Sequence, residues 1–125
     1  MEKKKILIAD DEPYVLKVAK IKFGNAGYDV TTVNNGLKAL ENMHSLRPDV
    51  LITDINMPLL TGKELCMRTN CLNDEKEFLT IVVTSRIGER DEEWAQSLQN
   101  TILLEKPFSP KEMLKIITHY FSRRG

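Results

Sequence analysis

The chain has 125 residues, of which 42% are hydrophobic and 29% charged, a composition typical of an ordinary globular domain. Lys plus Arg and Asp plus Glu number 18 each, and this zero net charge gives no support to binding of nucleic acid or membranes. Cys66 and Cys71 are too few and too oddly spaced for a zinc site. No apolar stretch suits a membrane span or a signal peptide. We therefore expect one domain, residues 1–125, in a reducing cytoplasm.

Short β-rich runs alternate with segments of helical period along the whole chain. The sequence predicts strands over 5–9, 29–33, 49–53, 79–84 and 101–105, and helices over 13–26, 36–46, 62–72, 90–99 and 110–122. Pro13 fits the first turn of the first helix, Ser109 and Pro110 fit the start of the last, and the charged segment 74–77 is typical of a solvated loop. Strands that alternate with helices predict an α/β fold: a doubly wound (βα)5 parallel sheet with helices on both faces.

Polar side chains with related chemistry stand where the predicted strands end. In such sheets, ligands bind outside the carboxyl ends of the strands, at the point where strand order reverses. The residues at these ends are Asp10 and Asp11 after the first strand, Asp54 after the third, Thr84 and Ser85 after the fourth, and Lys106 after the fifth. The second strand is followed by Asn34, Asn35 and Gly36, which are typical of a turn and helix cap. Carboxylates gathered in one crevice repel each other unless a cation lies between them, so we expect a divalent metal site and a reactive aspartate.

These side chains would suit phosphoryl transfer. A carboxylate such as that of Asp54 can attack phosphorus and form an acyl phosphate, provided that metal and fixed cations neutralise the charge. Asp10 and Asp11 would hold Mg²⁺, and a backbone carbonyl beyond Asp54, most naturally that of Asn56, would complete the metal shell. Lys106 would offset the remaining negative charge, while the Thr84 hydroxyl would donate to a phosphoryl oxygen.

Four segments resemble the motifs of the receiver domain of two-component response regulators. They are ILIADDEP at 6–13, TDINMPLLTG at 53–62, IVVTS at 81–85 and EKPFSP at 105–110. The resemblance covers the whole chain, with the four motifs in the expected order. It implies a flavodoxin-like fold like that of chemotaxis regulators, with a five-stranded sheet of order 2-1-3-4-5.

The resemblance also implies a role for each residue. Asp54 would be phosphorylated by a histidine kinase or a histidine phosphotransfer protein. Thr84 and Lys106 would bind the phosphoryl group. Mg²⁺ or Mn²⁺ would be held by Asp10, Asp11, Asp54 and the main-chain oxygen of Asn56. Asn56 and Arg86 occupy positions that face the attacking water in receivers, although a solvated Arg86 is an equal alternative. A receiver catalyses its own phosphorylation and slow dephosphorylation, yet it is mainly a signalling protein that switches a surface for a downstream effector. The resemblance implies no direct contact with nucleic acid or membrane, and a cis Lys106-Pro107 peptide.

Two positions depart from the receiver pattern. Three residues before the lysine, receivers usually carry a Tyr or Phe that moves inward with the threonine, and here that position is Leu103. Gln99-Asn100 also replaces the usual Gly-Ala pair. The usual coupling of threonine and aromatic residue cannot operate as such, so we expect another rearrangement, or one centred on the fourth helix and Trp94. The spacing of Trp94 and Leu98 favours packing, with partial exposure on a docking face as the alternative.

Other interpretations stay open at this point. Asp10 and Asp11 could cap the first helix, Asp54 could belong to a turn, Thr84 could bond to backbone, and Lys106 could be solvated. A pseudo-receiver, which binds partners without phosphorylation, is the main alternative function. A phosphatase of the haloacid dehalogenase type would need a second Asp where Asn56 stands. The chain is either a complete single-domain regulator or the receiver of a longer protein.

Overall fold

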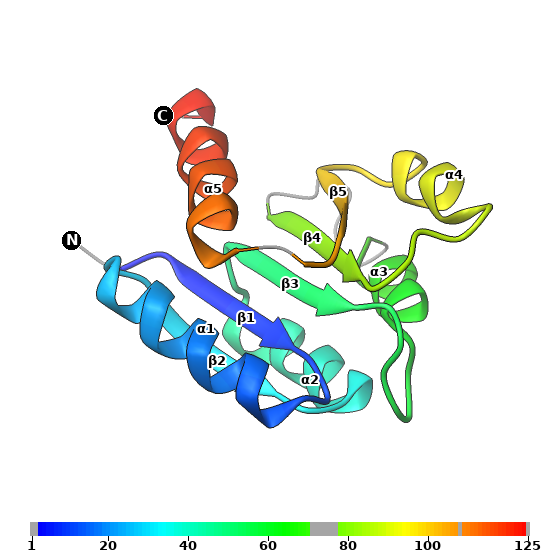
Figure 1. Ribbon diagram of the computed structural model, residues 1–125, viewed down its shortest axis with the longest axis horizontal. Coiled ribbons are helices and arrows are strands. Elements are labelled where there is room, and N and C mark those ends of the chain that lie inside the picture. Colours follow the sequence, from blue (N-terminus) through cyan, green and yellow to red (C-terminus); the bar gives the residue numbers. More distant parts are fainter. Residues whose placement is uncertain (1–2, 71–77, 108, 125) are drawn as a thin grey trace.

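The computed structural model describes residues 3–70, 78–107 and 109–124 (Figure 1). The strands are β1 (Lys5–Ala9), β2 (Asp29–Val33), β3 (Val50–Asp54), β4 (Leu79–Thr84) and β5 (Thr101–Glu105). The helices are α1 (Pro13–Asn25), α2 (Gly36–Leu46), α3 (Gly62–Asn70), α4 (Asp91–Gln96) and α5 (Pro110–Arg124). The predicted loop 74–77 and the last two residues of the predicted helix 62–72 lie outside the described residues.

The strands form one parallel sheet of order β2-β1-β3-β4-β5, which confirms the predicted doubly wound α/β fold. In its register, Ala9 lies opposite both Val33 and Thr53, and Asp54 lies opposite Val83. β1 therefore lies between β2 and β3, and the chain winds outward from β1 in both directions. The carboxyl ends of β1 and β3 meet at this switch point, where ligands bind in sheets of this kind.

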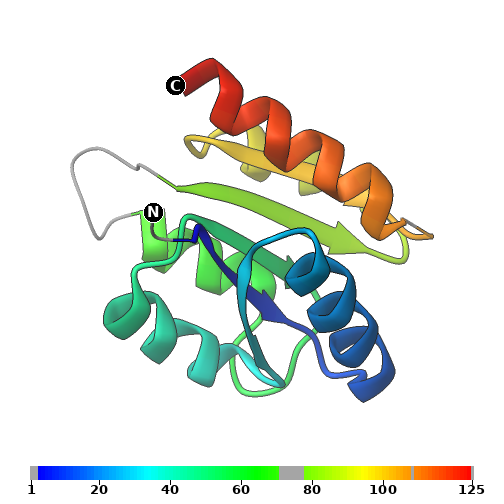
Figure 2. The same cartoon turned by 90° about the vertical axis from the view of Figure 1, so that its left-hand side faces the viewer.

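Helices cover both faces of the sheet (Figure 2). Alternate side chains of the strands enter separate apolar layers on these two faces. Ile6 and Ile8 of β1 pack with Phe23 of α1 and Ile117 of α5. Leu7 and Ala9 face the other way and join a layer that includes these side chains of α2 and α3: Ala39, Met43 and Leu65. Both faces are thus covered, and the ends of the strands remain accessible for functional side chains.

Local signals fix where several helices begin. Pro13 is the first residue of α1. The N–H at this position would have no partner within the helix, so a residue that lacks an N–H costs no hydrogen bond there. The Asn35 side chain accepts a hydrogen bond from the N–H of Lys38 at 2.8 Å and caps α2. Ser109 accepts one from the N–H of Glu112 at 3.1 Å at the start of α5. In the described part of the chain, no helix is both long and apolar enough to cross a bilayer.

The prediction of a helix over 90–99 was wrong in its length, because α4 stops at Gln96. The N–H of Leu98 instead donates to the carbonyl of Ala95 at 3.2 Å, a bond that tightens the turn. Asn100 then adopts a positive φ of 47°. This conformation directs the chain into β5, and the Asn100 carbonyl accepts a hydrogen bond from the N–H of Thr80 at 2.8 Å.

Candidate functional site

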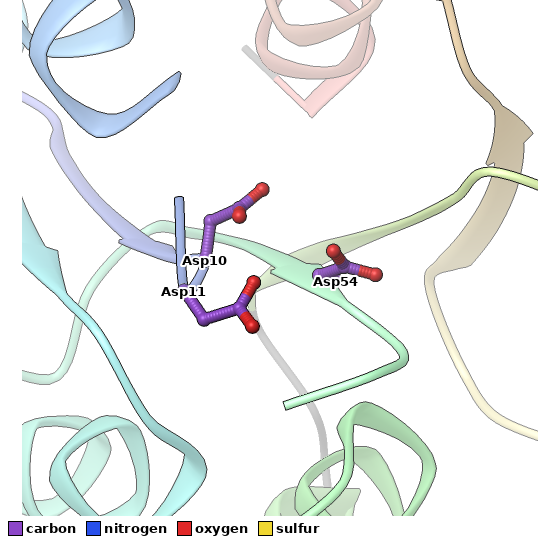
Figure 3. Close-up of side chains that lie close together, drawn as sticks. All are labelled: Asp10, Asp11 and Asp54. Carbon is purple, nitrogen blue, oxygen red and sulfur yellow. The ribbon is translucent and has the colours of Figure 1, made fainter. Parts of the chain in front are cut away.

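Three carboxylates lie together at the carboxyl ends of β1 and β3 (Figure 3). One oxygen each from Asp10, Asp11 and Asp54 lies within 4.8 Å of the other two. Among the residues that the structure describes, no other set of three acidic, histidine or cysteine side chains is as close. Asp10 and Asp54 are buried, with 5% and 8% of their surface exposed, while Asp11 is open to solvent. Two shielded acids and one exposed acid make a cluster that a cation can enter from outside.

Lys106 lies between the two buried acids. Its Nζ is 3.2 Å from Oδ2 of Asp54 and 3.4 Å from Oδ2 of Asp10. The backbone holds the lysine in place, since its N–H donates to the carbonyl of Thr84 at 2.7 Å. The Lys106-Pro107 peptide is cis, as the resemblance implied. Lys106 is therefore an ion-pair partner within the cluster, not a solvated side chain.

The electrostatics of the cluster leave negative charge without a partner. Burial raises the pKa of the Asp10 carboxyl, against the opposing effects of the Glu12 N–H and the Lys106 ammonium, while the nearby Asp54 raises it further. Burial alone would lower the pKa of Lys106, but the carboxylates of Asp10 and Asp54 outweigh it and the pKa is raised. One ammonium thus faces two buried acids, and a further cation would relieve their repulsion.

The Asp54 side chain is oriented by its own loop. The N–H of Asn56 donates to Oδ1 of Asp54 at 3.2 Å, while Oδ2 lies beside Lys106. Behind it, α3 begins against the end of the strand: a Cβ on Gly62 would lie 2.2 Å from the Asp54 carbonyl oxygen. Sequence reasoning missed this role of Gly62, although a glycine that opens a helix after the Asp54 loop was a visible signal.

Thr84 is placed near the cluster but is turned away from it. It is buried, and its hydroxyl donates to the carbonyl of Arg86 at 3.0 Å. Ser85 and Arg86 are exposed. A second anchor of this loop, also missed from the sequence, is the bond from the N–H of Ile87 to Oε1 of Glu105 at 3.2 Å. Of the predicted site residues, Asp10, Asp11, Asp54 and Lys106 lie together, Asn56 adjoins them, and Thr84 has a different hydrogen-bond partner.

A cavity of about 530 Å³ adjoins the cluster. It lies between α1, α5 and the sheet and is lined mainly by apolar side chains, among them Val15, Val18 and Met113. Tyr14, which is 77% exposed, also lines this cavity, as do Ser85 and Pro107. An incoming molecule would therefore meet apolar surface directly beside the acids.

Comparisons with known proteins agree with this architecture. Residues 6–118 match the family described as the response regulator receiver domain. The chain is 32% identical over 111 residues to the alkaline phosphatase synthesis transcriptional regulatory protein PhoP of Bacillus subtilis, covering 88% of this chain and 45% of that protein. It is 31% identical over 110 residues to the response regulator MprA of Mycobacterium ulcerans, covering 88% and 47%. The chain thus spans less than half the length of these curated relatives.

Solved structures show the same fold. The chemotaxis response regulator CheY4 of Vibrio cholerae matches with a TM-score of 0.84 and 28% identity, over 94% of this chain and 98% of that one. The Francisella response regulator 1452 receiver domain matches with a TM-score of 0.83 and 27% identity, over 98% and 99%. Sequence, sheet order and the acidic cluster lead to one conclusion: the chain belongs to the response regulator receiver domain family.

Proposed function

We propose that Asp54 is the phosphoacceptor of this receiver domain. The observation that carries the proposal is the pairing of Asp54 with Lys106 at 3.2 Å inside a cluster of three carboxylates. Asp54 lies at the carboxyl end of β3 beside the switch point, with one oxygen held by the N–H of Asn56. The other oxygen lies beside an ammonium that can offset the charge of an arriving phosphoryl group.

The proposed reaction moves one phosphoryl group from nitrogen to oxygen. An Asp54 carboxylate oxygen attacks the phosphorus of a phosphohistidine and forms an acyl phosphate, while the P–N bond breaks. The electron pair of that bond returns to the imidazole of the donor. Lys106 pairs with the phosphoryl oxygens, and Thr84 donates its hydroxyl to one of them after leaving the Arg86 carbonyl. Water later attacks the phosphorus, the P–O bond to Asp54 breaks, and inorganic phosphate leaves as the carboxylate is regenerated.

Receiver domains bind Mg²⁺ at an acidic pocket, and the donor set here fits such an ion. Mg²⁺ and Mn²⁺ favour carboxylate, carbonyl and water oxygens. We propose that the carboxylates of Asp10, Asp11 and Asp54 and the main-chain oxygen of Asn56 hold the ion. When bound, the cation offsets the charge of the acids and of the phosphoryl group. The raised pKa of Asp10 fits this role, since its ionised form needs a further positive charge.

Membership of the receiver family implies a histidine kinase as phosphodonor and an effector as target. We propose that residues 1–125 act as one receiver domain in the cytoplasm, with a sensor kinase or a histidine phosphotransfer protein as donor. The exposed Tyr14 and the apolar cavity beside the acids offer a surface on which such a donor can lie. The effector is a separate protein or an attached domain, and no direct contact with nucleic acid or membrane is proposed.

Intact mass after incubation with acetyl phosphate tests the proposal. With Mg²⁺, wild type should gain one phosphoryl group that hydroxylamine removes, and EDTA should prevent the gain. Asp54→Ala should gain none. Asp29→Ala is the matched control, because Asp29 is an exposed acid at the opposite end of the neighbouring strand β2 and should leave the gain unchanged. Equal uptake by Asp54→Ala would reject Asp54 as the acceptor.

A further inference from the structure

The single tryptophan of the chain, Trp94, belongs to α4. Trp94 has only 6% of its surface exposed, which excludes the half-exposed docking position and confirms its packing role. It belongs to a small apolar cluster with Cys66, Val82 and Ala95, against which Leu98 and Leu103 pack. Where receivers usually carry an aromatic side chain on the fifth strand, this chain has a leucine beside a cluster whose aromatic side chain comes from α4.

Asp91 connects this tryptophan to the loop before α4. The indole N–H of Trp94 donates to Oδ1 of Asp91 at 3.0 Å. The other carboxylate oxygen, Oδ2, accepts a short hydrogen bond from the N–H of Gly88. The N–H of Asp91 also donates to the Gly88 carbonyl at 3.2 Å. Both oxygens of one side chain are thus engaged, one by the loop and one by the tryptophan.

The same loop follows Thr84, whose hydroxyl has to turn towards the phosphoryl group in the proposed reaction. A threonine hydroxyl donates one hydrogen bond, and here it goes to the Arg86 carbonyl at 3.0 Å. To reach a phosphoryl oxygen on Asp54, the hydroxyl has to release that carbonyl. Arg86 lies two residues before Gly88, so a change at Arg86 alters the segment that Asp91 holds. Hydrogen bonds at both ends and the short backbone segment 86–88 between them therefore connect Thr84 to Trp94.

We propose that Gly88, Asp91 and Trp94 connect the phosphorylation site to α4 in place of the aromatic residue missing at position 103. When Thr84 turns towards the phosphoryl group, the released segment 86–88 shifts. Asp91 transmits the shift to Trp94, which then packs differently between α4 and the sheet. Because the connection responds to a phosphoryl group on Asp54, it depends on the function proposed above. Asp91 acts here as a positioning residue, since it touches neither the acids nor the phosphoryl group.

Fluorescence tests the connection directly, because Trp94 is the only tryptophan. Emission maximum and acrylamide quenching are recorded on wild type before and after acetyl phosphate with Mg²⁺, with intact mass measured on the same samples. We expect both signals to change with phosphorylation. Thr84→Ala should take up the phosphoryl group more slowly, because it lacks one donor to the phosphoryl oxygens, and it should lose the change when compared with wild type at equal mass gain. Asp91→Asn should lose most of it, since an amide offers one acceptor oxygen for two donors.

Glu92→Gln is the matched control, as it removes the same charge from an exposed neighbour on the same helix and should retain the wild-type change. Circular dichroism melts check that each variant is folded. Phosphorylated wild type with an unchanged Trp94 signal would overturn the connection and leave Asp54 as the acceptor. An equal signal change in Thr84→Ala would overturn the route through Thr84. Absence of any mass gain in wild type would overturn the proposed function, and the connection with it.

Discussion

Burial of Asp10 links the acidic cluster to the stability of the domain. Its pKa is raised from the ordinary value of 3.8, so the folded state holds a proton on Asp10 more tightly than the unfolded chain does. The stability that protonation contributes is present below pH 3.8 and is lost as the pH rises through the raised pKa. At neutral pH the ionised carboxylate therefore lowers the free energy of unfolding, a strain typical of functional sites.

We predict that Asp10→Asn raises the free energy of unfolding at pH 7 in EDTA, and that the gain shrinks as the pH falls towards 4. The amide keeps the shape of the side chain and removes the buried charge. Urea denaturation at several pH values measures the effect. Asp11→Asn is the control, because Asp11 is exposed and its gain should be smaller. A less stable Asp10→Asn at pH 7 would mean that attraction to Lys106 outweighs burial.

Single residues differ in how far their positions follow from the sequence. Asp10, Asp11 and Asp54 were predictable as neighbours because parallel strands place their carboxyl ends at one edge. Lys106 followed from the same rule. The bond from the Thr84 hydroxyl to Arg86 did not, because a threonine beside a turn has local backbone acceptors that compete with distant partners at similar energy. The Asp91 link to Gly88 and Trp94 was missed for the same reason.

At the scale of elements, the contact of α3 with the end of β3 depends on a missing side chain. A Cβ on Gly62 would meet the Asp54 carbonyl oxygen at 2.2 Å and the Ile55 Cα at 2.8 Å, and both are backbone atoms that cannot rotate away. By contrast, a Cβ on Gly24 in α1 would have open space around it. The two glycines give a matched pair within helices of the same protein.

We predict that Gly62→Ala lowers the free energy of unfolding by about 1–3 kcal/mol, the usual range for overpacking, and slows phosphorylation by displacing Asp54. Gly24→Ala should instead raise the free energy of unfolding by about 0.5–1 kcal/mol, because alanine is the better helix former. Urea denaturation and the rate of mass gain with acetyl phosphate measure both effects. If Gly62→Ala matched wild type in both, the close approach of α3 would have no bearing on the site.

The first and last residues of the helices show which local sequence signals are enough to predict a helix boundary. Proline, serine and asparagine predicted the first residues of α1, α2 and α5, since each satisfies or removes an orphan N–H. The end of α4 could not be predicted in this way. Trp94 and Leu98 continue a helical period, yet the connection to β5 needs Asn100 at positive φ before the sheet begins. A tertiary requirement overrides local periodicity there.

At the scale of the whole molecule, alternation of strands and helices predicted the doubly wound sheet, while its order came from the resemblance to receivers. The functional consequence is that the proposed cation site would not exist in the unfolded chain. Asp10 and Asp54 become neighbours only when β1 pairs with β3, as Ala9 does with Thr53. A ligand that binds the folded state alone raises its stability by mass action.

We therefore predict that Mg²⁺ raises the free energy of unfolding, by about 2.7 kcal/mol at a concentration one hundred times the dissociation constant. The rise should grow with the logarithm of concentration and vanish in EDTA. Urea denaturation in increasing MgCl₂, with KCl adjusted to constant ionic strength, measures it. Asp54→Ala should lose the rise because a ligand is missing, while Asp29→Ala, which removes an exposed acid of β2, should keep it. An equal rise in Asp54→Ala would mean that Mg²⁺ acts on exposed charges in general, with no site at the ends of β1 and β3.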